Sequence, residues 1–286
     1  MSENKTGLIM EGGAMRGMFT AGVTDVLLEN NITFDGAIGV SAGATFGCNF
    51  KSRQIGRAIR YNKIYAKDKR YCSLRSLIKT GDLYNAEFCY KTLPNELDIF
   101  DYDIFRKNPM EFYVTATDCE TGKAVYKEIS SLSDDEMLAW IRASASMPLV
   151  SKIVEVENYK LLDGGIADSI PLQYFESLGF NKNVVILTQP REYRKGPNKM
   201  LPFAKMALKK YPNIIEAMAK RHEFYNFEKD YVFGKADRNE ILVICPEKSL
   251  DIKRTEKDPR ELQRCYDAGR LAAKTRIQEI KDFLKH

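Results

Sequence analysis

Ala37-Ile38-Gly39-Val40-Ser41-Ala42-Gly43 is the stretch from which the fold of this chain is best read. Its apolar beginning predicts a buried strand, and residues 42–50 can continue as a helix. Gly39 and Gly43 flank Ser41 with the G-x-S-x-G spacing of a nucleophile elbow. Glycine suits such a turn because strand and helix backbones approach each other where a Cβ would clash. A plain small-residue turn between strand and helix explains the same pattern, so both interpretations stay open.

A second glycine-rich turn follows the first predicted strand, residues 7–10. It reads Glu11-Gly12-Gly13-Ala14-Met15-Arg16-Gly17, and a helical pattern begins at Phe19. The loop lacks the acidic ribose-binding residue of a dinucleotide site and the Gly-Lys-Ser/Thr of a Walker loop. An oxyanion hole in front of Ser41 fits better, with the backbone N–H groups of Gly13 and Ala14 as donors.

Arg16 lies within this loop and has two interpretations. We expect its guanidinium to hold the loop by hydrogen bonds to backbone carbonyls. The alternative is a contact with a phosphate group of the substrate.

The third motif, Asp163-Gly164-Gly165, follows the strand-like residues 159–162. An aspartate above two glycines can present its carboxylate to a neighbouring serine, although an ordinary Asp-Gly turn is also consistent with it. A serine hydroxyl needs a proton acceptor to act as a nucleophile. The chain has two histidines, the terminal His286 and His222 in a charged helical stretch. We therefore expect Asp163 to act on Ser41 directly, with a Ser41–Asp163–His222 triad as the alternative.

In this order, the glycine loop, the Ser41 motif and Asp163-Gly164-Gly165 resemble the patatin-like phospholipases. The resemblance covers about residues 7–175, including the predicted hairpin 115–126 and the run 143–148. It implies a three-layer α/β/α fold with a central, mostly parallel sheet. It also implies Ser41 as nucleophile, Asp163 as proton acceptor, and an oxyanion loop of Gly12, Gly13, Ala14 and Gly17. Ala14 replaces the middle glycine of that loop, so its N–H group donates only if the backbone angles permit.

Other patterns predict the remaining elements. Strands are expected at 111–117, 124–128, 184–187 and 241–245, and Ser133-Asp134-Asp135-Glu136 is a capping box that opens a helix. Helices are expected at 201–210 and 214–230, and one long helix from Pro259 to Leu284. Residues 51–105 show irregular helical signals, which suggests a mixed helical excursion over one end of the sheet.

Length and composition favour a single domain over residues 1–286, in which a helical region of about 200–286 packs on the motif-bearing part. Hydrophobic residues make up 44% and charged residues 29% of the 286 residues. The longest uncharged run, 36–50, is too short and glycine-rich to span a bilayer. The start of the chain has no apolar signal region, and the six cysteines form no C-x-x-C pair. We therefore expect reduced thiols, a cytoplasmic location, and no metal or cofactor.

The net charge of +5 is unevenly spread. Residues 51–80 contain ten basic residues against one acid, Asp68. The favoured interpretation is a solvated helical face whose long side chains cover the core, and the alternative is peripheral contact with an anionic membrane surface. No nucleic-acid-binding motif accompanies these residues.

These features predict a serine hydrolase of lipid esters, a phospholipase, lysophospholipase or esterase that acts through an acyl-enzyme at Ser41. Two alternatives remain. One is an acyltransferase or thioesterase with the same pair of residues, and the other is a non-catalytic lipid-binding protein that retains the fold. The head group, acyl position and chain length of the substrate, and the oligomeric state, are not predicted.

Overall fold

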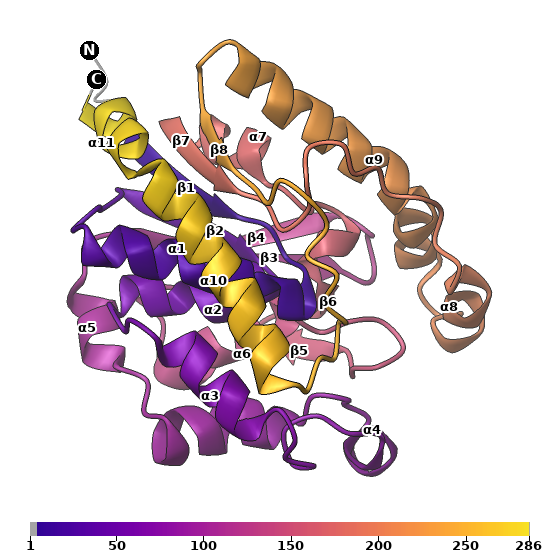
Figure 1. Ribbon diagram of the computed structural model, residues 1–286. Coiled ribbons are helices and arrows are strands. Elements are labelled where there is room, and N and C mark those ends of the chain that lie inside the picture. Colours follow the sequence, from indigo (N-terminus) through magenta and orange to yellow (C-terminus); the bar gives the residue numbers. More distant parts are fainter. Residues whose placement is uncertain (1–4, 286) are drawn as a thin grey trace.

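A computed structural model describes residues 5–285 and shows a sheet between two layers of helices (Figure 1). The strand order is β5-β6-β3-β2-β1-β7-β8, and β4 pairs with β3. Strands β1, β2, β3, β7 and β8 run parallel, whereas β4, β5 and β6 are antiparallel to their neighbours. The strands are β1 (Lys5–Met10), β2 (Gly36–Val40), β3 (Glu111–Asp118), β4 (Ala124–Glu128), β5 (Val154–Val156), β6 (Tyr159–Asp163), β7 (Phe180–Ile186) and β8 (Leu242–Ile244).

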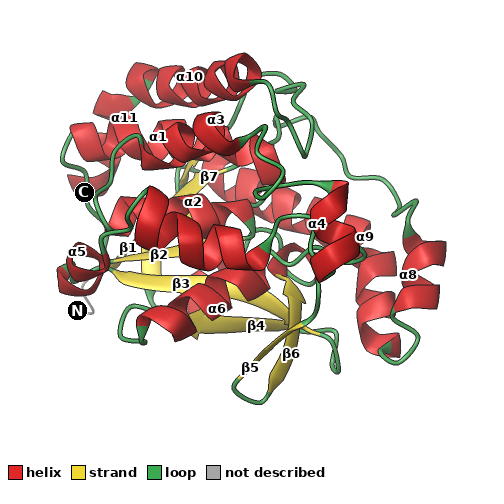
Figure 2. Ribbon diagram, turned by 90° about the horizontal axis from the view of Figure 1, so that it is seen from below, coloured by secondary structure: helices red, strands yellow, loops and turns green. Residues whose placement is uncertain are grey.

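Alternate residues of the central strands pack in two different hydrophobic cores, one on each face of the sheet. Leu8 and Met10 of β1 pack on one face of the sheet, and Ile9 between them packs on the other. This is the two-residue period of a strand buried on both faces. The first face is covered by α1 (Gly17–Glu29), α2 (Ala42–Lys51), α6 (Asp134–Ser144) and α10 (Pro259–Thr275). The second is covered by α7 (Leu172–Ser177) and α9 (Pro212–Asp237). The predicted three-layer α/β/α fold with a mostly parallel sheet is confirmed (Figure 2).

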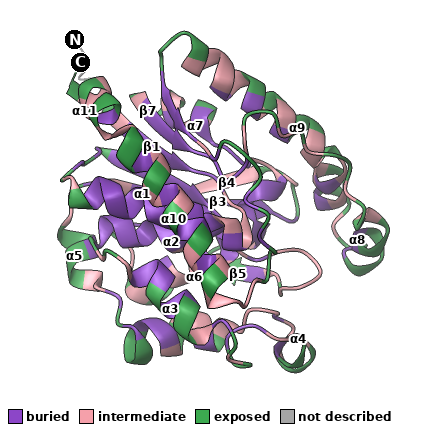
Figure 3. Cartoon of the chain, viewed as in Figure 1, coloured by how far each residue is buried: buried purple, intermediate pink, exposed green. Residues whose placement is uncertain are grey.

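Burial follows this layering. The sheet, α1 and α2 are largely buried, whereas α8 (Leu201–Ala207) and the outer side of α9 are exposed (Figure 3). The predicted excursion between residues 51 and 105 is confirmed as α3 (Arg57–Tyr65), α4 (Leu74–Thr80), the π-helix η2 (Phe88–Leu97) and α5 (Tyr102–Lys107). No helix within residues 5–285 is both long enough and apolar enough to cross a membrane.

The C-terminal helices differ from the sequence prediction of one long helix. Helix α10 ends at Thr275, and a separate helix α11 (Ile277–Lys285) follows. Arg276 between them leaves helical geometry, with φ −115°. Its guanidinium donates hydrogen bonds to the carbonyl of Val243 on β8 and to Glu279. The side chain of Arg276 thus ties the break to the edge of the sheet, a contact that the apolar period does not encode.

Some of the basic side chains in residues 51–80 are buried in the fold. Lys51 is fully buried, and its ammonium donates hydrogen bonds to the carbonyls of Asn108 and Met110. Arg57 is also buried and forms an ion pair with Asp98 at 3.3 Å. These contacts agree with the favoured interpretation, in which long basic side chains of this stretch cover the core.

Candidate active site

Strand β3 brings Ser41 and Asp163 together. Val40, the last residue of β2, pairs with Thr115 of β3, and Asp163, the last residue of β6, pairs with the next residue, Ala116. Strand β4 pairs with β3 along Tyr113–Thr117 and so occupies the opposite edge. Strand β6 therefore continues along the edge of β3 at the point where β2 stops. The ends of β2 and β6 face each other there, and each carries one member of the pair.

Ser41 lies on a strained turn between β2 and α2. Its backbone has φ 53° and ψ −118°, an uncommon conformation for a residue with a side chain. A Cβ at Gly43 would lie 2.2 Å from the carbonyl oxygen of Met10, and one at Gly39 would lie 2.6 Å from the backbone of Ala44. The glycines at both positions are therefore required by close backbone approach, as the G-x-S-x-G pattern predicts.

Asp163 is buried, and its carboxylate has two hydrogen-bond donors. The Ser41 hydroxyl donates to Oδ2 at 2.6 Å, and the N–H group of Gly165 donates to Oδ1 at 2.9 Å. Burial raises the pKa of Asp163, and the charge of Arg221 and these two hydrogen bonds partly offset the rise. A Cβ at Gly164 would lie 2.0 Å from the carbonyl oxygen of Thr115, so this glycine permits the tight turn below the carboxylate.

The glycine loop packs directly against Ser41. A Cβ at Gly12 would lie 2.9 Å from the Cβ of Ser41, and one at Gly17 would lie 2.7 Å from the ring of Phe46. Ala14 adopts a left-handed conformation with φ 49°, so alanine tolerates the geometry that glycine favours. Neither Gly13 nor Ala14 donates a backbone hydrogen bond to any residue within 5–285. Both N–H groups are thus available to a ligand.

Arg16 differs from its sequence expectation. Its side chain folds over Gly13, with Nε 3.3 Å from the position of a Gly13 Cβ. Nε is buried and has no hydrogen-bond partner among the described residues, so Arg16 does not hold the loop through backbone carbonyls. Thr188 holds it instead, because its hydroxyl donates to the carbonyl of Gly12 at 2.9 Å.

The run 143–148, predicted only as close packing, holds the backbones of both residues. The N–H group of Ser41 donates to the hydroxyl of Ser144 at 2.9 Å. The N–H group of Asp163 donates to the carbonyl of Ser146 at 2.8 Å. Sequence reasoning missed these roles because neither serine carries a sign of its partner, which for Ser144 lies 103 positions away.

His222 is not part of this arrangement. Its ring nitrogen Nδ1 lies 3.1 Å from the carbonyl of Ala219, within its own helix, and Nε2 lies 3.8 Å from Glu223. Within residues 5–285 no three His, Cys, Asp or Glu side chains gather in a way that suits a metal ion.

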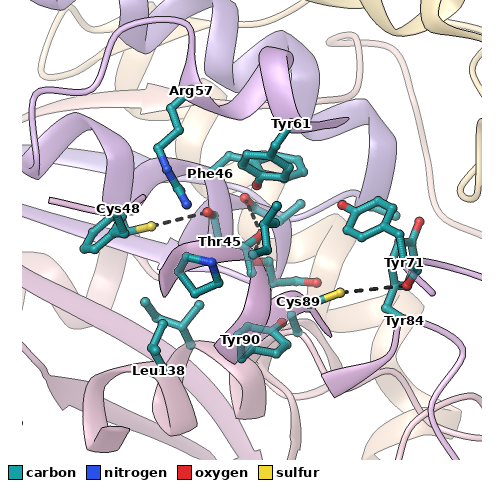
Figure 4. A pocket seen from close by; sticks show the side chains of 18 of the residues that line it. Thr45, Phe46, Cys48, Arg57, Tyr61, Tyr71, Tyr84, Cys89, Tyr90 and Leu138 are labelled. Carbon is teal, nitrogen blue, oxygen red and sulfur yellow. Dashed lines mark hydrogen bonds between the residues drawn. The ribbon is translucent and has the colours of Figure 1, made fainter. Parts of the chain in front are cut away.

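Ser41 lines an apolar cavity of about 120 Å³. Residues of α2, α3, η2 and α6 also line it, among them Thr45, Phe46, Tyr61, Tyr90 and Leu138 (Figure 4). Ser41 and Ala14 of the glycine loop both line it, so the cavity adjoins the serine and the loop. An aliphatic chain attached to a group at Ser41 fits this chemistry.

Two family models match separate parts of this chain. A family model described as patatin-like phospholipase matches residues 8–176, and one described as domain of unknown function (DUF6363) matches residues 211–285. The uncharacterized protein YjjU of Escherichia coli is 27% identical over 197 residues, which cover 65% of this chain and 52% of that protein. The uncharacterized NTE family protein Rv1063c of Mycobacterium tuberculosis is 27% identical over 196 residues, 68% of this chain and 52% of that protein.

The chain thus spans about half the length of these two relatives. A solved structure, VipD from Legionella pneumophila, aligns with a TM-score of 0.44 and 12% identity over 95% of this chain and 67% of that chain. The patatin-like model covers more than half of the present sequence, and the three motifs that it spans converge on Ser41 in the structure. The chain belongs to the patatin-like phospholipase family.

Proposed function

We propose that this protein is a serine acyl hydrolase of lipid esters that uses Ser41 as nucleophile and Asp163 as proton acceptor. The observation that carries the proposal is the 2.6 Å hydrogen bond from Ser41 Oγ to Asp163 Oδ2. A direct bond of this length supports proton transfer to a carboxylate without an intervening histidine.

The reaction divides into two steps. Ser41 Oγ attacks the ester carbonyl while its proton passes to Asp163, and the negative charge develops on the former carbonyl oxygen. The N–H groups of Gly13 and Ala14 stabilise this oxyanion, a contribution of about 3 kcal/mol per donor. Collapse releases the alcohol, which takes the proton from Asp163 and leaves an acyl group on Ser41. Water, deprotonated by Asp163, then attacks the acyl-enzyme. The C–O bond to Ser41 breaks, the fatty acid is released, and Asp163 returns the proton to Ser41 Oγ.

The buried position of Asp163 favours this role. A carboxylate of ordinary pKa is a weak base at neutral pH, and burial strengthens it by destabilising the charged form. Burial raises the pKa of Asp163, and the positive charge of Arg221 offsets part of this increase. Burial therefore makes this carboxylate more basic than that of an exposed aspartate.

The acyl chain of the substrate is proposed to occupy the apolar cavity beside Ser41. Its lining is largely hydrophobic and aromatic, and Ser41 is one of the lining residues. Burial of methylene groups there stabilises the bound ester by about 0.8 kcal/mol per group. This supports a lipid rather than a small polar ester as substrate.

Helix α4 is proposed as the contact with an anionic membrane. Leu74 and Ile78 on this helix are 72% and 84% exposed, and Arg75 and Lys79 accompany them. Tyr71 and Tyr84, which flank the helix in sequence, both line the apolar cavity. Exposed apolar side chains between cations suit a lipid surface, and the residues on either side of this segment line the cavity.

Flotation with vesicles that contain an anionic phospholipid tests this contact. The variant Leu74→Asp/Ile78→Asp should bind at least tenfold more weakly than wild type. Leu271→Asp on α10, which changes a leucine that is 64% exposed and does not line the cavity, should bind as wild type does. Equal binding by all three proteins would contradict the contact through α4.

Hydrolysis of a short p-nitrophenyl ester tests the catalytic proposal. Ser41→Ala and Asp163→Asn should lose activity while circular dichroism shows that they are folded, and His222→Ala should keep it. Activity that survives Asp163→Asn but is lost in His222→Ala would contradict the direct Ser–Asp pair. Wild-type protein that labels with a fluorophosphonate but passes its acyl group only to a thiol or alcohol would identify the transferase alternative. Folded protein that neither reacts nor labels would favour a lipid-binding role.

A further inference from the structure

Three arginines without ion-pair partners gather beside Ser41 and Asp163. Within residues 5–285, five arginines form no ion pair: Arg16, Arg53, Arg75, Arg221 and Arg254. Arg53 and Arg75 are isolated and exposed. The other three, together with Lys195, lie near the catalytic pair, and we call these four residues the cation cluster.

Arg16 and Arg221 come from different elements, and both side chains lie close to the pair of Ser41 and Asp163. Arg16 lies over Gly13 of the glycine loop, with Nε 3.3 Å from the position of a Gly13 Cβ. Arg221 on α9 lies over Gly165, with Nη2 3.0 Å from the position of a Gly165 Cβ. The Nε atoms of both are buried and have no hydrogen-bond partner among the described residues. A buried donor without a partner is costly, and a bound anion would satisfy it.

Lys195 and Arg254 come from the loops that follow β7 and β8. Loops at the carboxyl ends of parallel strands meet at one edge of the sheet, where Ser41 and the glycine loop also lie. The ammonium of Lys195 lies 4.1 Å from the ring centroid of Tyr225, one helical turn beyond Arg221. Within residues 5–285 no hydrogen-bond acceptor or carboxylate partner is found for the ammonium of Lys195 or the guanidinium of Arg254. Arg254 is the most open of the four.

The charges of the cluster act on one another. Burial, followed by the charge of Arg221, lowers the pKa of Lys195 to about 8, with smaller effects of Arg16 and Arg254. Partial burial, followed by the charges of Arg16 and Arg221, lowers the pKa of Arg254. Such mutual repulsion is destabilising, and a bound anion relieves it.

The cluster and the apolar cavity are separate regions beside Ser41. None of the four cations lines the cavity, although Ser41 does. The two regions meet at Tyr84, a cavity residue whose hydroxyl donates to the carbonyl of Arg254 at 3.2 Å. An ester at Ser41 can therefore direct its acyl chain to one side and a charged alcohol portion to the other.

The charge of the cluster selects the kind of anion. The four cations interact electrostatically with two carboxylates, Asp163 and Glu11, and these six groups together carry an excess of two positive charges. A phosphate monoester carries about −1.5 to −2 at neutral pH, whereas a phosphodiester carries about one negative charge. Planar guanidinium groups also match the oxygens of phosphate well.

We propose that Arg16, Lys195, Arg221 and Arg254 form an anion subsite that holds the terminal phosphate monoester of a glycerolipid while its acyl ester lies at Ser41. This assignment rests on the proposed hydrolase function for the ester, but the binding of phosphate does not. Three of the four residues lie beyond the part of the chain that matches the patatin-like model, so the subsite is a property of the C-terminal half of this protein.

Isothermal titration of the Ser41→Ala protein with inorganic phosphate tests the subsite without catalysis. In this Ser41→Ala background, Arg254→Gln or Lys195→Gln should weaken phosphate binding about tenfold, because each removes one charge-assisted hydrogen bond. Adding Arg53→Gln, which removes the same charge from an isolated exposed arginine, should leave it unchanged. Equal phosphate binding by the cluster variants and the Arg53→Gln control would overturn the subsite.

Hydrolysis of three lipids with the same acyl chain tests the source of the phosphate. These are a monoacylglycerol phosphate, its phosphodiester with glycerol, and the neutral monoacylglycerol. Wild-type kcat/KM should be highest for the monoester, and Arg254→Gln should reduce the monoester-to-neutral ratio about tenfold, with Arg53→Gln as control. Phosphate binding without any preference among the lipids would overturn the assignment to a lipid phosphate. Failure to hydrolyse any ester would instead contradict the proposed function, while the titration still decides the subsite.

Discussion

Thr115 and Ala116 on β3 explain why two residues 122 positions apart form a hydrogen bond. They pair with Val40 and Asp163 respectively, so neighbouring residues of one strand set the spacing of the pair. The distance between Ser41 and Asp163 is therefore fixed by sheet register rather than by a flexible loop. Rigid placement of a nucleophile and its base is what a hydrolase of this kind requires.

The pH dependence of hydrolysis should report the pKa of Asp163. The carboxylate acts as base only when deprotonated, so activity should fall as pH decreases through its pKa. Because burial raises that pKa, the loss should occur at a higher pH than the value of about 3.9 for an exposed aspartate. Arg221 lowers the pKa, so Arg221→Gln should move the acid limb of kcat/KM to still higher pH. The Arg53→Gln control should retain the wild-type limb, and a shift of the limb to lower pH in Arg221→Gln would contradict this account.

The hydroxyl of Ser144 should support activity because it holds the backbone of Ser41 in place. It is fully buried and accepts the N–H group of Ser41, so Ser144→Ala leaves a buried donor without a partner, at about 1–3 kcal/mol. We expect kcat/KM for a short ester to fall about tenfold with little change in secondary structure. Ser146→Ala is the matched control, because Ser146 holds Asp163 through its backbone carbonyl and its hydroxyl bonds only to Arg142. Equal activities of the two variants would show that the Ser144 contact does not position Ser41.

Among the elements, the π-helix η2 and helix α6 form the walls of the apolar cavity. Leu93 and Pro94 of η2 and Leu138 and Ile141 of α6 line it. π-helical turns are rare and often occur at functional sites. Here the wide turn places Cys89, Tyr90 and Leu93 on the same cavity wall. The cavity thus depends on an element that hydrophobic periodicity does not predict.

Filling the cavity should change the preferred acyl length. Leu138 lines it and is half-buried, so Leu138→Trp adds volume to the wall. We expect the ratio of kcat/KM for a decanoyl ester to that for a butyryl ester to fall at least tenfold, since several methylene groups lose their place. Leu97→Trp, at an exposed position on η2 that does not line the cavity, serves as the control. An unchanged ratio in Leu138→Trp would mean that the acyl chain binds elsewhere.

Some elements could be predicted from the sequence, and others could not, for identifiable reasons. The Ser133 capping box, the hairpin and the strand before Ser41 follow local rules and are confirmed. The pairing of β6 with β3 is non-local, and so are the roles of Ser144 and Arg221. The prediction of one long C-terminal helix was wrong because the contacts of Arg276 with the sheet override the apolar period. The catalytic roles of Ser41 and Asp163, the cytoplasmic location and the one-domain organisation stay predictions.

For the whole molecule, the packing of α10 on α1 joins the C-terminal half to the active site. A Cβ at Gly22 would lie 2.1 Å from the carbonyl oxygen of Tyr266, and one at Gly269 would lie 2.0 Å from that of Phe19. The two helices therefore touch backbone to backbone. Helix α1 begins at Gly17, directly after the glycine loop, so α10 supports the element that carries the proposed oxyanion hole.

Gly269→Leu should lower the stability of the whole protein, which should still unfold in a single transition. A leucine cannot fit where a Cβ already meets backbone, so we expect the free energy of unfolding to fall by about 3 kcal/mol or more. If residues 1–286 form one domain, thermal unfolding of wild type and variant should each show a single transition. Leu271→Gln, an exposed position on the same helix, should change stability by less than about 0.5 kcal/mol. Two separate transitions would contradict the one-domain organisation.

Mapping the covalent adduct of a fluorophosphonate probe tests the central claim most directly. The labelled protein would be digested and the modified peptide identified by mass spectrometry. The account predicts one adduct, on Ser41, with labelling absent in Ser41→Ala and strongly slowed in Asp163→Asn. An adduct on another serine, or efficient ester hydrolysis by Ser41→Ala, would contradict the role of Ser41 as nucleophile.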